Sequence, residues 1–232
     1  MLVIPSPRRQ RRQKRPPWPR QAIAAAAVAA AVAVVARAAD LYPDAVSMEA
    51  ALRQGRDYRV ETLDRGASVA VFAIHGGIEP GTARLARALA GADWNLFVFQ
   101  ALSRDVPYAA LHVTSSHFND PRALRLARSS SLGISIHGEK TPGESACIGG
   151  LNAPLRQAVA RALRAIAIEA REPCDRFPAL DLDNIANIPR DRGIQIEMTK
   201  SLRADLVRDP ERLALFVEAI RAAVSRVTGP PR

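Results

Sequence analysis

A histidine and a glutamate stand four residues apart directly after an apolar run of the sequence. The run 68–74 ends at His75, two glycines (Gly76 and Gly77) follow, and Glu79 lies just beyond them. An imidazole nitrogen and a carboxylate oxygen are both ligands of zinc, and glycines let the backbone turn so that two side chains reach one point. The segment therefore predicts part of a metal site at the end of a buried strand.

Two further apolar runs end in side chains of the same kinds. The run 132–136 ends at His137, and the run 193–196 ends at Glu197. A carboxylate beside a zinc-activated water accepts its proton and returns it to the leaving amine, so Glu197 is the candidate general base. The alternative for Glu197 is a solvated position at the edge of a sheet. The predicted zinc ligands are His75, Glu79 and His137.

Basic side chains are concentrated at the amino terminus. The first 39 residues hold eight basic and no acidic residues, which leaves 25 basic and 23 acidic residues in the rest, a net charge of +2. This near balance predicts no nucleic-acid partner.

An uncharged stretch, 22–36, follows the basic segment and is followed in turn by Ala36-Arg37-Ala38. This pattern is typical of a secretory signal peptide, with an uncleaved anchor as the alternative. We therefore predict a signal peptide at residues 1–39 and a secreted or periplasmic mature domain at residues 40–232, with no stable membrane insertion after cleavage. The two cysteines, Cys147 and Cys174, can pair in an exported protein or remain two small buried side chains, and the sequence leaves this open.

Strand-like and helix-like patterns alternate through the mature chain, which predicts a single α/β domain with a mostly parallel or mixed central sheet and helices on both faces. The predicted strands are 58–63 at an edge, 68–74, 94–99, 110–114, 132–136 and 193–198. The predicted helices are 47–54, one after Pro80, one from Asp120-Pro121, 153–170 and one from Asp209-Pro210. In this scheme His112 is a sheet-face residue, and 171–192 is a long functional loop.

Four segments together resemble the poly-γ-glutamate hydrolase family, which was first known from bacteriophages and is related in fold to the zinc carboxypeptidases. They are HGGIEPGT at 75–82, LHVTSSHFNDP at 111–121, SIHG at 135–138 and RGIQIEM at 192–198. The likeness covers roughly residues 44–226. It implies a compact α/β domain with one zinc ion, the three ligands named above and Glu197 as the general base. It also implies that the polar loop with His117 and Asp120 lies on the substrate side.

The predicted function is a secreted zinc-dependent hydrolase that cleaves γ-glutamyl amide bonds of poly-γ-glutamate or a related polymer. Because this polymer is a polyanion, Arg190 and Arg192 are candidates to bind its carboxylates, with ordinary solvated loop charges as the alternative. Two other functions stay open. One is an exported zinc amidase or peptidase that trims peptidoglycan, and the other is a catalytically silent polyanion-binding protein of the same fold. The sequence does not predict the oligomeric state.

Overall fold

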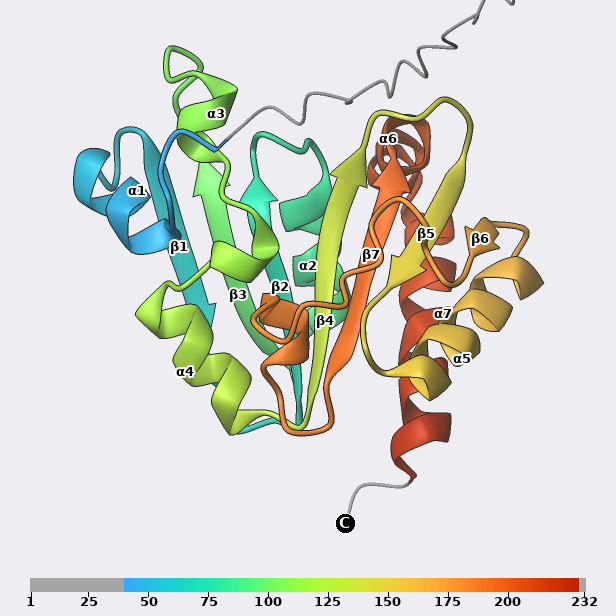
Figure 1. Ribbon diagram of the computed structural model, residues 1–232. Helices are drawn as coiled ribbons and strands as arrows, with labels where there is room; N and C mark the ends of the chain where they lie inside the picture. Colours follow the sequence, from blue (N-terminus) through green and yellow to red (C-terminus); the bar gives the residue numbers. More distant parts are fainter. Residues whose placement is uncertain (1–39, 230–232) are drawn as a thin grey trace, which may run out of the picture. The chain divides into compact units, whose positions relative to one another are not determined.

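The structure is a computed structural model that describes residues 40–229, so the predicted signal peptide lies outside the described residues. One mixed sheet of seven strands runs through this part of the chain (Figure 1). The strands lie in the order β1 (Tyr58–Leu63), β3 (Asn95–Ala101), β2 (Val69–Gly76), β4 (Leu132–Glu139), β7 (Gly193–Thr199), β5 (Ser145–Gly149) and β6 (Glu169–Arg171). The four central strands, β3 to β7 in this order, are parallel, whereas β1 and β5 run antiparallel to their inner neighbours.

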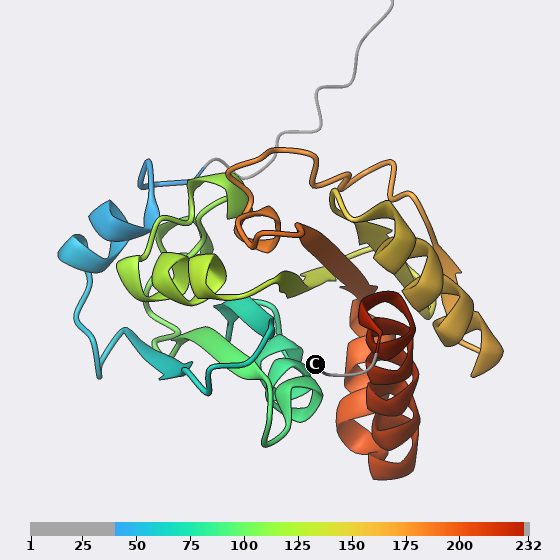
Figure 2. The same ribbon diagram turned by 90° about the horizontal axis from the view of Figure 1, so that it is seen from below.

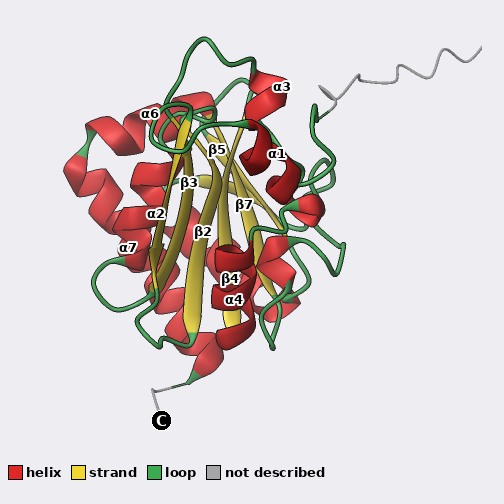
Figure 3. Ribbon diagram, turned by 90° about the vertical axis from the view of Figure 1, so that its left-hand side faces the viewer, coloured by secondary structure: helices red, strands yellow, loops and turns green. Residues whose placement is uncertain are grey.

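Helices cover both faces of the sheet, and each face has its own apolar core (Figure 3). One face carries α2 (Thr82–Ala90), α5 (Ala153–Ala165), α6 (Lys200–Arg208) and α7 (Pro210–Thr228), with α5 and α7 side by side (Figure 2). The other carries α1 (Ala45–Ala51), α3 (Tyr108–Leu111), α4 (Pro121–Ser129) and the short 3₁₀ turns η1 (Ser115–His117) and η2 (Ile185–Asn187). The predicted fold class is confirmed. No helix within residues 40–229 has the length and apolar character that crossing a bilayer requires.

The central strands are apolar on both faces because helices cover both. Every residue of β2 is buried, whereas the edge strand β1 exposes part of its length. Two helices begin where the sequence offers a capping aspartate followed by proline: the side chains of Asp120 and Asp209 accept hydrogen bonds from the first turns of α4 and α7.

The strand predicted at 110–114 is wrong. Its first residues form α3, and 112–114 is an extended connection outside the sheet. Leu111 and Val113 are buried there, which explains the strand-like alternation. The backbone of this connection bonds to side chains instead of a neighbouring strand, since the Thr114 amide donates to Asp40 and the Val113 carbonyl accepts from His75. His112 is therefore not a sheet-face residue.

The strands β5 and β6, the helix α6 and the short 3₁₀ turns η1 and η2 were not predicted. The predicted helix 153–170 ends at Ala165, and a positive φ at Ala167 turns the chain into β6. Cys147 on β5 forms a disulfide with Cys174, which settles the choice that the sequence left open.

The carboxylate of Glu49 on α1 provides a pH-dependent contribution to stability. Burial and the neighbouring Asp120 carboxylate raise the pKa of Glu49 to about 7 from an ordinary value of 4.5. The folded state therefore binds a proton that the unfolded state releases, and the stability that this proton contributes is lost as pH rises from about 5 to about 8.

We expect Glu49→Gln to remove this loss. The free energy of unfolding of the variant relative to the parent should rise by roughly 1–2 kcal/mol between pH 5 and pH 8, less than the full shift implies because Arg122 and solvent screen the charge. Urea denaturation at both pH values measures it. Exposed Glu218 offers the matched control, Glu218→Gln. A Glu49→Gln effect that is the same at both pH values would contradict the assignment.

Candidate metal centre and general base

The ends of three adjacent parallel strands, β2, β4 and β7, meet at one edge of the sheet. The chain continues from β2 toward β3 and from β4 toward the opposite side, so the connections diverge between these two strands. Ligands of open α/β sheets bind at such a point, outside the carboxyl ends of the strands. His75 is the penultimate residue of β2, and His137 lies near the end of β4.

One extra residue in β2 decides the direction of His75. Ala73 pairs with Val98 and Gly76 with Gln100, so three steps along β2 face two steps along β3. Strict alternation would place His75 on the same face as Ala73, which packs in the core beneath α2, and away from His137. The extra residue forms a β-bulge, which turns His75 to the same face of the sheet as His137. Bulges next to active sites commonly redirect a side chain in this way.

The loop after β2 is held close to β3 by glycine. Gly77 has φ +87°, and a Cβ there would lie 2.3 Å from the Ala101 carbonyl oxygen. No other residue fits this position without moving β3. The tight turn returns the chain so that the Glu79 amide donates to the His75 carbonyl at 2.9 Å. Glu79 consequently faces the two histidines.

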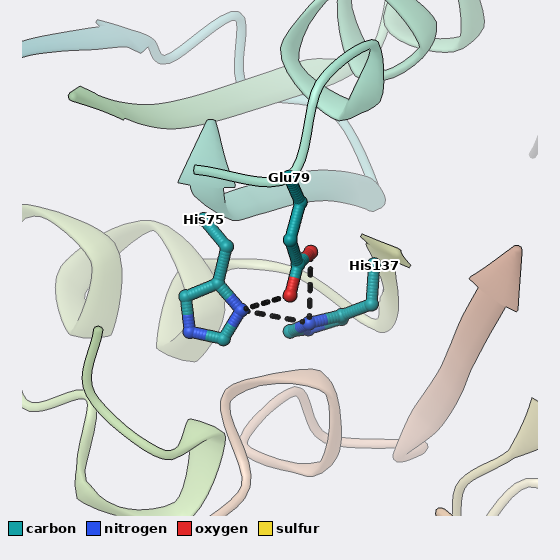
Figure 4. A group of neighbouring side chains, drawn as sticks. All are labelled: His75, Glu79 and His137. Carbon is teal, nitrogen blue, oxygen red and sulfur yellow. Dashed lines mark hydrogen bonds and ion pairs between the residues drawn. The ribbon is translucent and has the colours of Figure 1, made fainter. Parts of the chain in front are cut away.

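The three side chains converge on one point (Figure 4). His75 Nδ1 lies 2.9 Å from Glu79 Oε1 and 3.2 Å from His137 Nδ1. His137 Nδ1 lies 3.8 Å from Glu79 Oε2. All three residues are buried. The structure therefore brings together the three residues that the sequence singled out as metal ligands.

The outer nitrogen of each imidazole has its own partner. His75 Nε2 lies 2.9 Å from the Val113 carbonyl, which can only accept, so Nε2 carries a proton and Nδ1 is the nitrogen left to face inward, toward Glu79 and His137. His137 Nε2 lies 2.8 Å from the Ser135 hydroxyl and 3.4 Å from that of Ser115. Partners of this kind orient metal-binding histidines.

The charge states of the three side chains favour binding of a cation. Burial lowers the pKa of His137 to about 3, so this ring is neutral at neutral pH. Burial alone would raise the pKa of Glu79, but His75 and His137 hold it below its ordinary value, and the Gly138 amide donates to Oε2 at 2.7 Å. Burial opposes the charged form of His75 as well, but the Glu79 carboxylate raises its pKa.

A zinc ion fits this donor set. Two inward nitrogens and a carboxylate oxygen leave one position open, as catalytic zinc sites do. Ligands bound at 2.0–2.1 Å with tetrahedral angles are about 3.3 Å apart, close to the observed separation of the two Nδ1 atoms. Two imidazole nitrogens facing each other need a proton or a cation between them, and a metal ion satisfies all three donors at once.

Glu197 stands beside the histidine pair. It is opposite His137 in the parallel register of β4 and β7, so both side chains point to the same face. Burial, together with the negative charges of Glu79 and Glu139, holds the pKa of Glu197 well above its ordinary range. Gln195 Nε2 donates to Glu197 Oε1 at 2.9 Å, and Asn184 holds Gln195 in turn. Glu197 is therefore a buried, oriented carboxylate and not a solvated edge residue.

His112 lies at the site, although the sequence analysis placed it elsewhere. Its ring stacks on His75 at a centroid distance of 4.2 Å, and Tyr108 stacks on its other side at 5.1 Å. His112 Nδ1 lies 2.6 Å from Asp40 Oδ1. The motif 111–121 contained the signal, but the alternating apolar neighbours of His112 pointed to a strand.

The residues predicted to contact substrate are not brought to this centre. Arg190 and Arg192 precede β7 and lie at the opposite end of that strand from Glu197, where Arg190 bonds to Ser131 and Asp191. Asp120 is fully buried, caps α4 and pairs with Arg122. His117 is exposed on η1, whose first residue, Ser115, is the one that reaches His137.

Comparisons with known proteins show the family and the fold. The sequence profile of the family described as poly-gamma-glutamate hydrolase matches residues 42–214. The solved structure of a bacteriophage poly-gamma-glutamate hydrolase is similar with a TM-score of 0.77 and 31% identity, covering 82% of this chain and 99% of that one. The zinc-free structure of YndL has a TM-score of 0.72 and 29% identity, covering 80% of this chain and 98% of that one.

Two curated relatives come from Bacillus subtilis. UPF0714 protein YndL is 34% identical over 163 residues, which are 65% of this chain and 60% of YndL. The SPbeta prophage-derived protein YoqZ is 31% identical over 154 residues, which are 64% of this chain and 55% of YoqZ. The chain thus spans less than two thirds of the length of these relatives.

Replacing His137 by alanine should abolish tight metal binding. The variant loses one of three donors, so its zinc affinity should fall by more than the roughly 10–100-fold typical of losing a partner outside the ligand set. Competition with a chromophoric chelator measures the dissociation constant. The control is His117→Ala, which removes an exposed imidazole and should leave affinity unchanged. Stoichiometric zinc at parental affinity in His137→Ala would eliminate His137 as a ligand.

Proposed function

Because the chain belongs to the poly-γ-glutamate hydrolase family, we propose that it is a zinc-dependent hydrolase of γ-glutamyl amide bonds in poly-γ-glutamate. The observation that carries the proposal is the convergence of His75, Glu79 and His137 beside a buried carboxylate, Glu197, in register with His137. A metal-dependent hydrolase needs a metal site, which activates the carbonyl and the water, and a general base, which transfers the proton.

The three converging side chains would hold the metal, His75 and His137 through Nδ1 and Glu79 through its carboxylate. When bound, zinc polarises the scissile carbonyl, makes a water molecule more acidic and, as a nearby positive charge, favours the ionised form of Glu197. The hydrogen bonds to Val113 and Ser135 keep the two imidazoles turned inward throughout.

Glu197 performs the proton transfers in this proposal. Gln195 occupies its Oε1 with a hydrogen bond, which leaves Oε2 to accept the proton of the attacking water. The same carboxyl then gives the proton to the leaving amine nitrogen. Burial suits this role, because it raises the pKa of Glu197 above its ordinary value and so makes the carboxylate a stronger proton acceptor than an exposed glutamate.

Glu197→Gln should separate chemistry from metal binding. The amide nearly matches the carboxylate in shape but cannot accept the proton, so kcat should fall by roughly 10²–10⁴-fold, the range for a lost general base, while zinc content and melting temperature stay close to the parent. All three are measured on one preparation. Glu144→Gln, which changes an exposed carboxylate paired with Arg212, is the control. Loss of zinc in Glu197→Gln would make Glu197 a ligand, and unchanged turnover would place the base elsewhere.

The substrate is tested with purified poly-γ-glutamate and peptidoglycan fragments in parallel, with and without a chelator. We expect zinc-dependent shortening of the polymer. Release of products from wall fragments alone would instead favour a peptidoglycan-trimming amidase. Stoichiometric zinc without hydrolysis of either substrate would favour a silent polyanion-binding protein.

We further propose that the protein is exported. The basic segment and apolar stretch within residues 1–39 have the pattern of a signal peptide, and the Cys147–Cys174 disulfide suits an oxidising compartment. The exported protein should begin at Ala39 or Asp40, as read by amino-terminal sequencing, and Ala38→Arg should block cleavage. Protein that accumulates in the cytoplasm with residues 1–39 intact would contradict export.

A further inference from the structure

One arginine is buried behind the candidate centre without an acidic partner. Arg203 on α6 is 4% exposed. Within the part of the chain that the structure describes, its hydrogen bonds go to main-chain carbonyl oxygens: Nε donates to Pro80 at 2.9 Å, and Nη1 donates to Glu139 at 3.3 Å and to Met198. A buried guanidinium is costly unless it is bonded. Here the main chain supplies that compensation.

The three carbonyls belong to the three segments that carry the site. Pro80 directly follows Glu79, Met198 directly follows Glu197, and Glu139 lies two residues beyond His137. These segments are far apart in the sequence and come together only at the carboxyl ends of β2, β4 and β7. A single planar side chain therefore ties together the backbone on which all four site residues stand.

Arg203 reaches this position from the opposite side of the sheet. Gly138 alternates with His137 along β4, and a Cβ on Gly138 would lie 2.2 Å from Arg203 Nη1. The guanidinium occupies the space that a side chain would fill at this position. The Gly138 amide in turn donates to Glu79 Oε2, so Arg203 is separated from the ligand set by one peptide unit.

Arg203 also places a positive charge among a cluster of buried acids. Its charge interacts with those of Glu79, Glu139 and Glu197, each at most 7% exposed. Glu139 has a partner of its own in Arg176. Neither Glu79 nor Glu197 bonds to Arg203, so the guanidinium compensates their charges without withdrawing an oxygen from the site.

We propose that Arg203 is a positioning residue for the metal centre and the general base. It holds the three strand ends at the separation that the ligands and Glu197 require, and it acts through the main chain rather than by touching substrate. This inference rests on the proposed function, because it assumes that His75, Glu79 and His137 bind zinc.

The test compares Arg203→Met and Arg203→Lys with Arg221→Met. Arg221 is the control because it also donates to main-chain carbonyls, those of Leu89 and Ala90, but lies on α7, away from the strand ends, where it pairs with Asp93. Zinc dissociation constant, kcat, KM and melting temperature are measured for each. In Arg203→Met we expect zinc affinity to fall by about 10–100-fold, the range for losing a residue that supports metal ligands. We also expect kcat to fall at least tenfold with KM within about twofold, because the chemistry and not the substrate contact is disturbed.

Arg203→Lys keeps the charge but not the planar fork, so it should recover part of the zinc affinity and of kcat. Arg221→Met should lower the melting temperature yet keep the parental dissociation constant and kcat.

A folded Arg203→Met variant that loses only thermal stability, as Arg221→Met does, would overturn the proposal. If Arg203→Met does not fold, Arg203→Lys decides: parental zinc affinity and kcat in that variant overturn it. A parent chain that binds no zinc overturns both this inference and the proposed function, whereas an active, zinc-binding parent with unaffected Arg203 variants overturns this inference alone.

Discussion

The in-register pairing of three parallel strands is the constraint on which the site depends. Parallel β2, β4 and β7 end at the same edge of the sheet, and His137 stands directly opposite Glu197. Regular parallel pairing would leave His75 on the opposite face of the sheet from His137. The bulge in β2 turns His75 to the same face. With a regular β2, the two imidazoles would point to opposite sides of the sheet and no shared ion could bind.

The second constraint is the burial of charge. His75, Glu79, His137 and Glu197 are all nearly inaccessible to solvent, which would destabilise the fold if their charges were uncompensated. Opposite charges and main-chain donors compensate these charges. Glu79 faces two imidazoles and the Gly138 amide, and the Arg203 guanidinium interacts with the charges of both Glu79 and Glu197. Burial also shifts the pKa values of the metal ligand and the general base in opposite directions. It lowers the pKa of His137, which keeps that ring neutral, and raises the pKa of Glu197. Neutral imidazole is the form that binds metal, and a carboxyl of raised pKa is the form suited to proton transfer.

Much of the fold follows from local patterns. The central strands are apolar runs bounded by glycine and polar residues, and α4 and α7 begin at a capping aspartate followed by proline, so the places and types of these elements were predictable. The short elements were not. β5 and β6 have few residues, and their stability comes from pairing with β7 and with each other. The connection 112–114 has the alternation of a strand, but its backbone partners are Asp40 and His75, which are remote in sequence.

The sequence by itself determined which chemistry is possible, because the identities of His75, Glu79, His137 and Glu197 and their positions after apolar runs are local facts. Only the tertiary structure decided how they meet. The extra residue in β2, the stacking of His112 on His75 and the three carbonyls gathered by Arg203 all depend on atoms brought together from distant segments, which no spacing along the chain encodes. The placement of Arg190 and Arg192 has the same cause. They are close to Glu197 in sequence, but an extended strand advances about 3.3 Å per residue, so the length of β7 carries them to the other end of the sheet.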